Sequence, residues 1–236
     1  MSIFYAPDAR STGVLPEEES QHAVRVLRLK AGDEIEIVDG KGNYFRAVLT
    51  NANHKQCGFE IREAIADFGK RNYRLHIALA PTKNIDRFEW FVEKAVEIGI
   101  DEITPLICRF SERKVIKPER VEKIIVAAAK QSQKAYFPVL NPLCNFNDFI
   151  KTATADQKFI AHCYESEKKP LQQVLKKSSD VIILIGPEGD FSVEEVQFAT
   201  GNNYQPISLG NSRLRTETAG IVACHTVALL NEKNFE

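Results

Sequence analysis

The sequence has no excess of charge of either sign. Its 236 residues include 31 lysines and arginines against 32 aspartates and glutamates. Proteins that bind nucleic acid through their overall charge are strongly basic, so this balance excludes that class. A local basic face remains possible, because it needs only a few cations on one surface.

Cysteine is scarce, and no CxxC motif occurs. An odd number of scattered cysteines argues against a complete disulfide framework, so we expect reduced thiols. No apolar run approaches the roughly 18 residues of a membrane span, and the N-terminus lacks the features of a signal peptide. These absences favour a cytoplasmic protein. The cysteines are Cys57, Cys108, Cys144, Cys163 and Cys224.

The best-known phosphate-binding motifs are absent as well. Neither GxGxxG nor GxxxxGK[ST] occurs, which disfavours a nucleoside triphosphate as ligand and makes a plain dinucleotide-binding enzyme remote. There is also no internal repeat and no low-complexity tract.

The N-terminal part of the chain predicts a small β module. Glu34–Val38 alternates polar and apolar residues, and strand patterns also cover Tyr44–Leu49 and Gly58–Arg62. We expect an antiparallel, barrel-like module with one short helix, about Ser20–Arg28. A polar stretch at 66–72 predicts a linker, which gives domains at 1–68 and 73–236.

From Tyr73 onward, strands alternate with helices, which predicts an α/β domain with a mostly parallel sheet covered on both faces. One helix buries a stripe that begins at Phe88 and stops at Gly99, and another begins at Pro118. Ser192 and Glu195 form a capping box. The predicted strands are 75–80, 103–107, Phe159–Ala161, Val181–Ile185 and Pro206–Leu209.

The last helix, about Glu217–Leu230, is apolar on nearly every side, so we expect it to be buried. Thr216 is its expected N-cap. Gly220 lies inside it at a cost of about 1 kcal/mol relative to alanine, which indicates that something packs closely there.

Two short segments predict the active site. Ile185–Phe191 and Leu209–Ala219 each follow a strand and lead into a helix, at the sheet edge where open α/β folds bind ligands. Glycines in the first segment allow a backbone to approach a ligand closely. From local chemistry alone, the first segment could equally be an ordinary strand-to-helix turn. In the second segment, Arg215 and Glu217 could equally be a simple capping pair.

These segments resemble the RsmE-type enzymes of the SPOUT methyltransferase superfamily. The resemblance covers essentially the whole chain and extends to His22–Leu29 with Gly32-Asp33, Lys83–Arg87 and Lys94–Ile100. It implies an N-terminal PUA-like β-barrel that helps bind RNA, and a C-terminal domain with a deep trefoil knot. It also implies a homodimer that methylates N3 of a uridine in 16S ribosomal RNA, with S-adenosylmethionine as donor and without a metal.

The resemblance implies roles for individual residues. Glu217 and Arg215 are the catalytic candidates, as the base for the uridine N3 proton and as the cation that stabilises the uridine anion. The expected cofactor-binding residues are Ala161, His162, Ile185, Gly186, Glu188, Gly189, Leu209, Gly210, Leu214, Thr216, Thr218 and Ala219. The expected RNA-binding residues are Arg25, Arg28, Lys30, Arg109, Lys134 and Arg213.

Several positions depart from the family pattern. Asp190 stands where many relatives have a second glycine. Lys134 stands where an arginine is usual, and lysine keeps the positive charge but lacks the bidentate guanidinium fork of arginine. No arginine precedes Arg10, although relatives often carry one in the first few residues. Cys163 is expected in the core rather than in a nucleophilic pair with His162, because neighbours on a strand point to opposite faces.

Two other functions remain open at this point. A SPOUT methyltransferase acting on tRNA would carry the same motifs. A non-catalytic RNA-binding module would keep the fold, although the presence of Glu188, Arg215 and Glu217 argues against it.

Overall fold

The computed structural model describes residues 3–232 and divides into two compact units. The first unit comprises the chain through Lys70 together with Val126–Phe137, and the second comprises Arg71–Ile125 and the chain from Pro138 onward. The expected domain ends at residues 1 and 236 lie outside the described residues.

The first unit contains a four-stranded sheet in the order β1-β2-β3-β4. Its strands are β1 (Ile3–Tyr5), β2 (Glu34–Val38), β3 (Tyr44–Leu49) and β4 (Phe59–Ile65). The β2–β3 and β3–β4 pairs are antiparallel as expected, but β1 pairs with β2 in parallel. Alternation along β2 buries Ile35 and Ile37 against Phe4 and Phe45.

The helix expected near residue 20 differs in its bounds. Three short segments precede β2, namely α1 (Ala9–Thr12), α2 (Glu17–Gln21) and a π-helical turn at His22–Val26. The α2 helix begins directly after Pro16 with three glutamates in its first turn, where carboxylates are favoured. The helical backbone has ended by Arg28, which adopts a φ of 55°.

The second unit is built on an eight-stranded sheet whose strand pairs are all parallel, as expected. Seven strands follow the order β10-β12-β9-β11-β5-β6-β7, and β8 pairs with β6. The strands are β5 (Arg74–Leu79), β6 (Glu102–Ile107), β7 (Val139–Leu140), β8 (Cys144–Asn145), β9 (Gln157–Ala161), β10 (Lys169–Pro170), β11 (Asp180–Ile185) and β12 (Gln205–Ser208).

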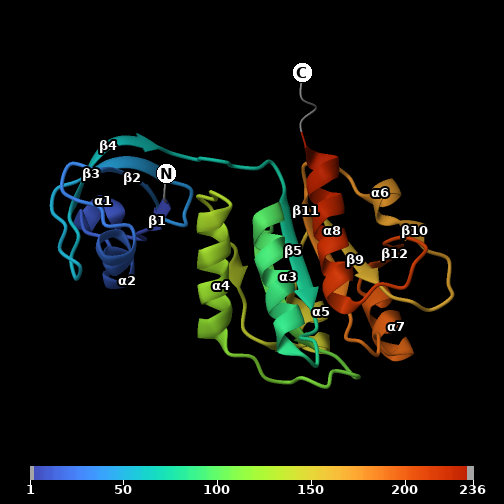
Figure 1. Cartoon of the computed structure of the whole chain (residues 1–236). Helices are drawn as coiled ribbons and strands as arrows, with labels where there is room; N and C mark the ends of the chain where they lie inside the picture. Colours follow the sequence, from blue (N-terminus) through green and yellow to red (C-terminus); the bar gives the residue numbers. More distant parts are fainter. Residues whose placement is uncertain (1–2, 233–236) are drawn as a thin grey trace. The chain divides into compact units, whose positions relative to one another are not determined.

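Helices cover both faces of this sheet. On one face, Ala78 and Ile182 pack with Phe149 of α5 (Phe146–Thr152) and Ala199 of α7 (Val193–Gly201). On the other face, α3 (Ile85–Ile98) and α8 (Thr216–Asn231) lie side by side next to β5 (Figure 1). The remaining helices are α4 (Pro118–Gln131), which begins at Pro118 as expected, and α6 (Leu171–Val174).

Helix α8 confirms one prediction and corrects two. A Cβ atom at Gly220 would lie 2.6 Å from Leu79 Cδ1 and 2.6 Å from Phe91 Cε2, so the glycine is needed for close packing. The helix is not buried on nearly every side, because Leu229 is 55% exposed. Thr216 is not the N-cap but the first helical residue, since its hydroxyl donates to the Gly186 carbonyl instead.

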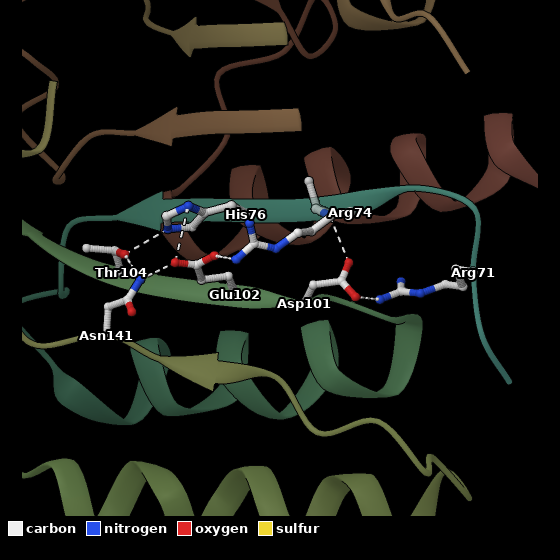
Figure 2. Close-up of polar contacts among 8 residues, drawn as sticks. Arg71, Arg74, His76, Asp101, Glu102, Thr104 and Asn141 are labelled. Atoms are coloured by element: carbon white, nitrogen blue, oxygen red, sulfur yellow. Dashed lines mark hydrogen bonds and ion pairs between the residues drawn. The ribbon is translucent and has the colours of Figure 1, made fainter. Parts of the chain in front are cut away.

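A partly buried polar network links β5 and β6 near the beginning of each strand (Figure 2). The Nε2 atom of His76 lies 2.7 Å from the Thr104 hydroxyl, and its Nδ1 atom lies 3.7 Å from Glu102 Oε1. Glu102 also accepts hydrogen bonds from Arg74 and Asn141. Burial lowers the pKa of His76 to about 4, so the imidazole is neutral at pH 7.

None of the described helices is both long and apolar enough to cross a membrane.

Candidate active site

Strands β9, β11 and β12 end side by side and bring three loops to one edge of the sheet. Ala161 at the end of β9 pairs with Ile185 of β11 on one side and with Ile207 of β12 on the other. The two predicted segments therefore meet the loop after β9, which is the arrangement expected at the carboxyl edge of a parallel sheet.

Two cavities open between these loops, with volumes of about 270 and 420 Å³. The smaller cavity lies at the Gly186–Asp190 turn and Arg215, and the larger one lies at the Ser208–Ser212 loop. The residues that line both are Ala161, Cys163, Arg213, Leu214 and Ala219. Because they share this lining, the two cavities adjoin each other and form one candidate site.

The Gly186–Asp190 turn is held from two directions. Glu188 Oε1 accepts a hydrogen bond of 2.9 Å from the Lys83 backbone N–H, which ties the turn to the loop before α3. The Thr216 hydroxyl donates to the Gly186 carbonyl over 3.0 Å, which ties the turn to the start of α8. The two predicted motifs are thus joined directly by a buried hydrogen bond.

The backbone conformation and hydrogen bonds of Asp190 explain why aspartate can stand where many relatives have a second glycine. Its φ of 67° lies in the left-handed region, which glycine adopts freely and aspartate adopts better than most other residues. Its carboxylate accepts from the Cys163 N–H at 2.7 Å and from the Phe191 N–H at 2.8 Å. The side chain therefore replaces the freedom of glycine with a tether between two loops of the site.

His162 lies in the lining of the larger cavity and is buried, with 8% of its surface exposed. Neither ring nitrogen has a hydrogen-bond partner among the described residues. Burial lowers its pKa, and the nearby Lys168 lowers it further, so the ring is neutral and offers one donor and one acceptor. Buried polar atoms without partners are rare and need an explanation, and a bound ligand is one explanation for a residue in a cavity lining.

Arg215 and Glu217 have different surroundings. Arg215 is exposed and lines the smaller cavity. The Glu217 side chain is only 10% exposed and is not part of either lining, and its Oε1 atom lies 3.8 Å from Arg87 Nε. Its Oε2 atom is buried and has no hydrogen-bond partner in the part of the chain that the structure describes.

The structure brings together most residues expected to bind the cofactor. All of them line one of the two cavities except Gly189 and Thr218. Gly189 packs against Phe110, because a Cβ atom there would lie 3.0 Å from Phe110 Cβ.

The sequence interpretation missed several lining residues and was wrong about Cys163, which is exposed at the rim rather than packed in the core. The reason is that β9 has ended by that position. The missed lining residues outside the two predicted segments are Cys163, Lys168, Ile207 and Ser208, and those inside the segments, to which the sequence analysis gave no role, are Pro187, Asp190, Asn211 and Ser212. Contiguity with the two motifs was the available signal for most of them.

The expected RNA-binding residues fall in both units. Arg25, Arg28 and Lys30 are exposed in the first unit, where Lys134 is half-buried. The second unit contains the exposed Arg109 and Arg213. Arg213 lines both cavities, so of this set it lies nearest to the candidate cofactor.

Comparison with family models gives the class of the protein. Residues 69–228 match an RNA methyltransferase domain, and residues 15–62 match an RNA methyltransferase PUA domain. The fold and the site therefore define a methyltransferase domain that follows a PUA-like domain.

Individual relatives narrow the class. Ribosomal RNA small subunit methyltransferase E of Mesomycoplasma hyopneumoniae is 34% identical over 75% of this chain and 78% of its own length. The enzyme of the same name from Rickettsia conorii is 29% identical over 92% and 89%. The chain belongs to the ribosomal RNA small subunit methyltransferase E family.

Solved structures agree with this assignment. A probable rRNA-methyltransferase from Porphyromonas gingivalis is 42% identical, with a TM-score of 0.92 and 98% of each chain covered. The structure of ribosomal RNA small subunit methyltransferase E from Neisseria gonorrhoeae, bound to S-adenosylmethionine, is 26% identical, with a TM-score of 0.87 and 98% of each chain covered.

Proposed function

We propose that this protein transfers a methyl group from S-adenosylmethionine to N3 of a specific uridine in 16S ribosomal RNA of the small ribosomal subunit. The observation that carries the proposal is the candidate site at the ends of β9, β11 and β12, in a chain of this family. The names of its relatives and the S-adenosylmethionine held by a structural neighbour support the substrate and the donor.

The residues present fit the cofactor. The neutral His162 ring has a donor and an acceptor without partners, and Ala161, Leu214 and Ala219 give the site apolar walls. We assign cofactor binding to the twelve residues that the sequence analysis names for this role. Gly189 and Thr218 line neither cavity, and they would contribute by holding their neighbours in the two loops. The bound cofactor supplies a methyl group already activated by a positive sulfur, so no metal is required for the transfer.

The protein must then align the uridine and remove its N3 proton. Holding the reacting atoms in line contributes about 7–11 kcal/mol to such a reaction. Glu217 is the proposed base, and Arg215, which lines the smaller cavity, is the proposed cation that stabilises the negative charge on the uridine.

RNA binding is proposed for the PUA-like domain, residues 1–68, and for the edge of the methyltransferase domain, residues 73–236. Arg25, Arg28, Lys30, Arg109, Lys134 and Arg213 would contact phosphates, which position RNA without reading its sequence. The exposed ring of Phe110, next to Arg109, offers a surface on which an unpaired base can stack.

The family resemblance supports four further proposals: a barrel in the PUA-like domain, a deep trefoil knot in the methyltransferase domain, a cytoplasmic location and a homodimer. The surface of the second unit supports the homodimer. Leu229 of α8 is 55% exposed and Trp90 of α3 is 44% exposed, and these two helices pack together. Exposed apolar side chains on neighbouring helices suit contact with a second copy.

A methyl-transfer assay tests the reaction. Purified protein would receive tritium-labelled S-adenosylmethionine and small ribosomal subunits from a strain that lacks the gene. We expect label in 3-methyluridine after digestion to nucleosides. Absence of label with cofactor binding intact by calorimetry would move the substrate to tRNA or another RNA, and absence of both would leave a non-catalytic RNA-binding module.

A further inference from the structure

Arg87 and Glu217 form an ion pair between the first turns of two packed helices. Arg87 lies in the first turn of α3, which Asn84 caps through its side chain. Glu217 lies in the first turn of α8, which the Thr216 hydroxyl and the close packing at Gly220 hold in place. The backbones on both sides of the pair are therefore fixed by independent contacts.

The pair leaves polar atoms unused on both sides. Arg87 Nε lies 3.8 Å from Glu217 Oε1, and the Arg87 guanidinium makes no hydrogen bond within residues 3–232. Glu217 Oε2 is buried, and none of these described residues gives it a hydrogen bond. A purely structural ion pair would satisfy these atoms, because a buried carboxylate with one unpaired oxygen is destabilising.

A carboxylate that can accept a hydrogen bond and a guanidinium that can donate one therefore lie together at this pair. The edge of uracil has the complementary order, since its N3–H donor lies between two carbonyl oxygens. Cytosine has an acceptor at N3 and an amino group beside it, so the same pair would not match it. Enzymes that modify a base outside the helical stack read such an edge through hydrogen bonds.

We propose that Arg87 and Glu217 together read the Watson–Crick edge of the target uracil, and that Arg87 is a catalytic residue. The inference rests on the proposed function. Glu217 Oε2, which is buried in this structure, accepts the N3–H bond once the exposed Arg87 side chain moves aside, and a terminal nitrogen of Arg87 donates to a neighbouring carbonyl oxygen. With 40% of its side chain exposed, Arg87 is the accessible member of the pair and the side from which the base enters.

The chemistry balances within this arrangement. The N3 proton moves to Glu217 Oε2, and the electron pair that it leaves on N3 forms the new bond to the methyl carbon. The electrons of the carbon–sulfur bond remain on sulfur, which becomes neutral. Arg87 stabilises the negative charge that the carbonyl oxygen carries while the proton leaves.

Substitutions at Arg87 test the proposal against a matched control. Arg87→Gln removes the charge, and Arg87→Lys keeps the charge but removes the planar fork. The control is Arg120→Gln, because Arg120 pairs with Glu89, whose side chain is 11% exposed and thus as buried as Glu217. The readouts are kcat and KM for 3-methyluridine formation, cofactor affinity by calorimetry and the thermal unfolding midpoint.

We expect Arg87→Gln to lower kcat about 100-fold, which is typical for loss of one transition-state donor, with cofactor affinity unchanged. Arg87→Lys should recover only part of this loss, and Arg120→Gln should stay within about twofold of the unsubstituted protein. Because the pair acts as a unit, adding Arg87→Gln to Glu217→Gln should slow the reaction little further.

The proposal is overturned if Arg87→Gln loses no more activity than Arg120→Gln, or if Arg87→Lys restores full kcat. If Arg87→Gln does not fold, Arg87→Lys carries the test alone. The unsubstituted protein separates the two levels of inference: failure to form 3-methyluridine removes the proposed function, whereas normal formation with unaffected variants removes only the role of Arg87.

Discussion

At the residue scale, Asp190 shows how aspartate can take the place of a glycine for a physical reason. The backbone at the end of the Gly186–Asp190 turn needs a positive φ, which glycine adopts at no cost. Aspartate adopts it less easily but adds two backbone hydrogen bonds, one of them to the loop after β9. The substitution therefore keeps the turn and stiffens one wall of the site.

His76 gives a prediction about pH. Its pKa is lowered to about 4 by burial, below the ordinary value of 6.5, so the folded state binds fewer protons than the unfolded chain between these values. The stability that this residue contributes is present above pH 6.5 and is lost as the pH falls toward 4. The loss amounts to about 3 kcal/mol over that range.

Urea unfolding between pH 7 and pH 4 measures this effect. The variant His76→Gln should show a shallower fall in the free energy of unfolding than the unsubstituted protein, and His225→Gln, at an exposed histidine, is the control. Identical slopes for all three proteins would show that His76 is not the titrating group.

At the element scale, the position of α8 is set by glycine rather than by hydrophobic pattern alone. Gly220 lets the helix approach β5 and α3 so closely that Leu79 and Phe91 occupy the space of a side chain. This approach holds the first turn of α8 in place, where the Thr216 hydroxyl donates to the Gly186 carbonyl of the Gly186–Asp190 turn. The site therefore depends on a packing contact in the interior of the helix.

Two glycine-to-alanine substitutions separate packing from helix propensity. Alanine at Gly220 gains about 1 kcal/mol of helix propensity but overpacks a closed core, which costs about 1–3 kcal/mol. We expect a net loss of stability together with weaker cofactor binding. Alanine at Gly201, where a Cβ atom meets nothing within 4 Å, should be neutral or stabilising.

Chemical denaturation and calorimetry with S-adenosylmethionine provide the measurements for both variants. Equal stabilisation by the two alanines would contradict the packing argument, because it would mean that the core beside Gly220 relaxes freely.

At the scale of the whole molecule, two units share one chain, and their boundaries are not simple cuts in the sequence. Residues Val126–Phe137 belong to the first unit although they lie inside the segment that the sequence pattern assigns to the second. Ala135 contributes to a cluster with Ile3, Val38 and Tyr44, and the Tyr136 hydroxyl donates to Asp67. Such long-range packing leaves no local signal in the chain.

Cofactor binding should stabilise the methyltransferase unit by mass action. S-adenosylmethionine at 100 times its Kd should add about 2.7 kcal/mol to the free energy of unfolding. For a chain of this size, we expect the Tm to rise by about 5–10 °C in a calorimetric scan. ATP at the same concentration is the control, and an equal rise with ATP would indicate a general nucleotide site instead.

The sequence alone determined the parallel α/β sheet, the strands β2 and β3, the capping box of α7 and the location of the candidate site, because these follow from local periodicity and from short motifs. Tertiary structure alone decided the exposure of Cys163, the pairing of Arg87 with Glu217 and the membership of residues 126–137. These features depend on which distant segments pack together, and packing between distant segments is not encoded in any single stretch of residues.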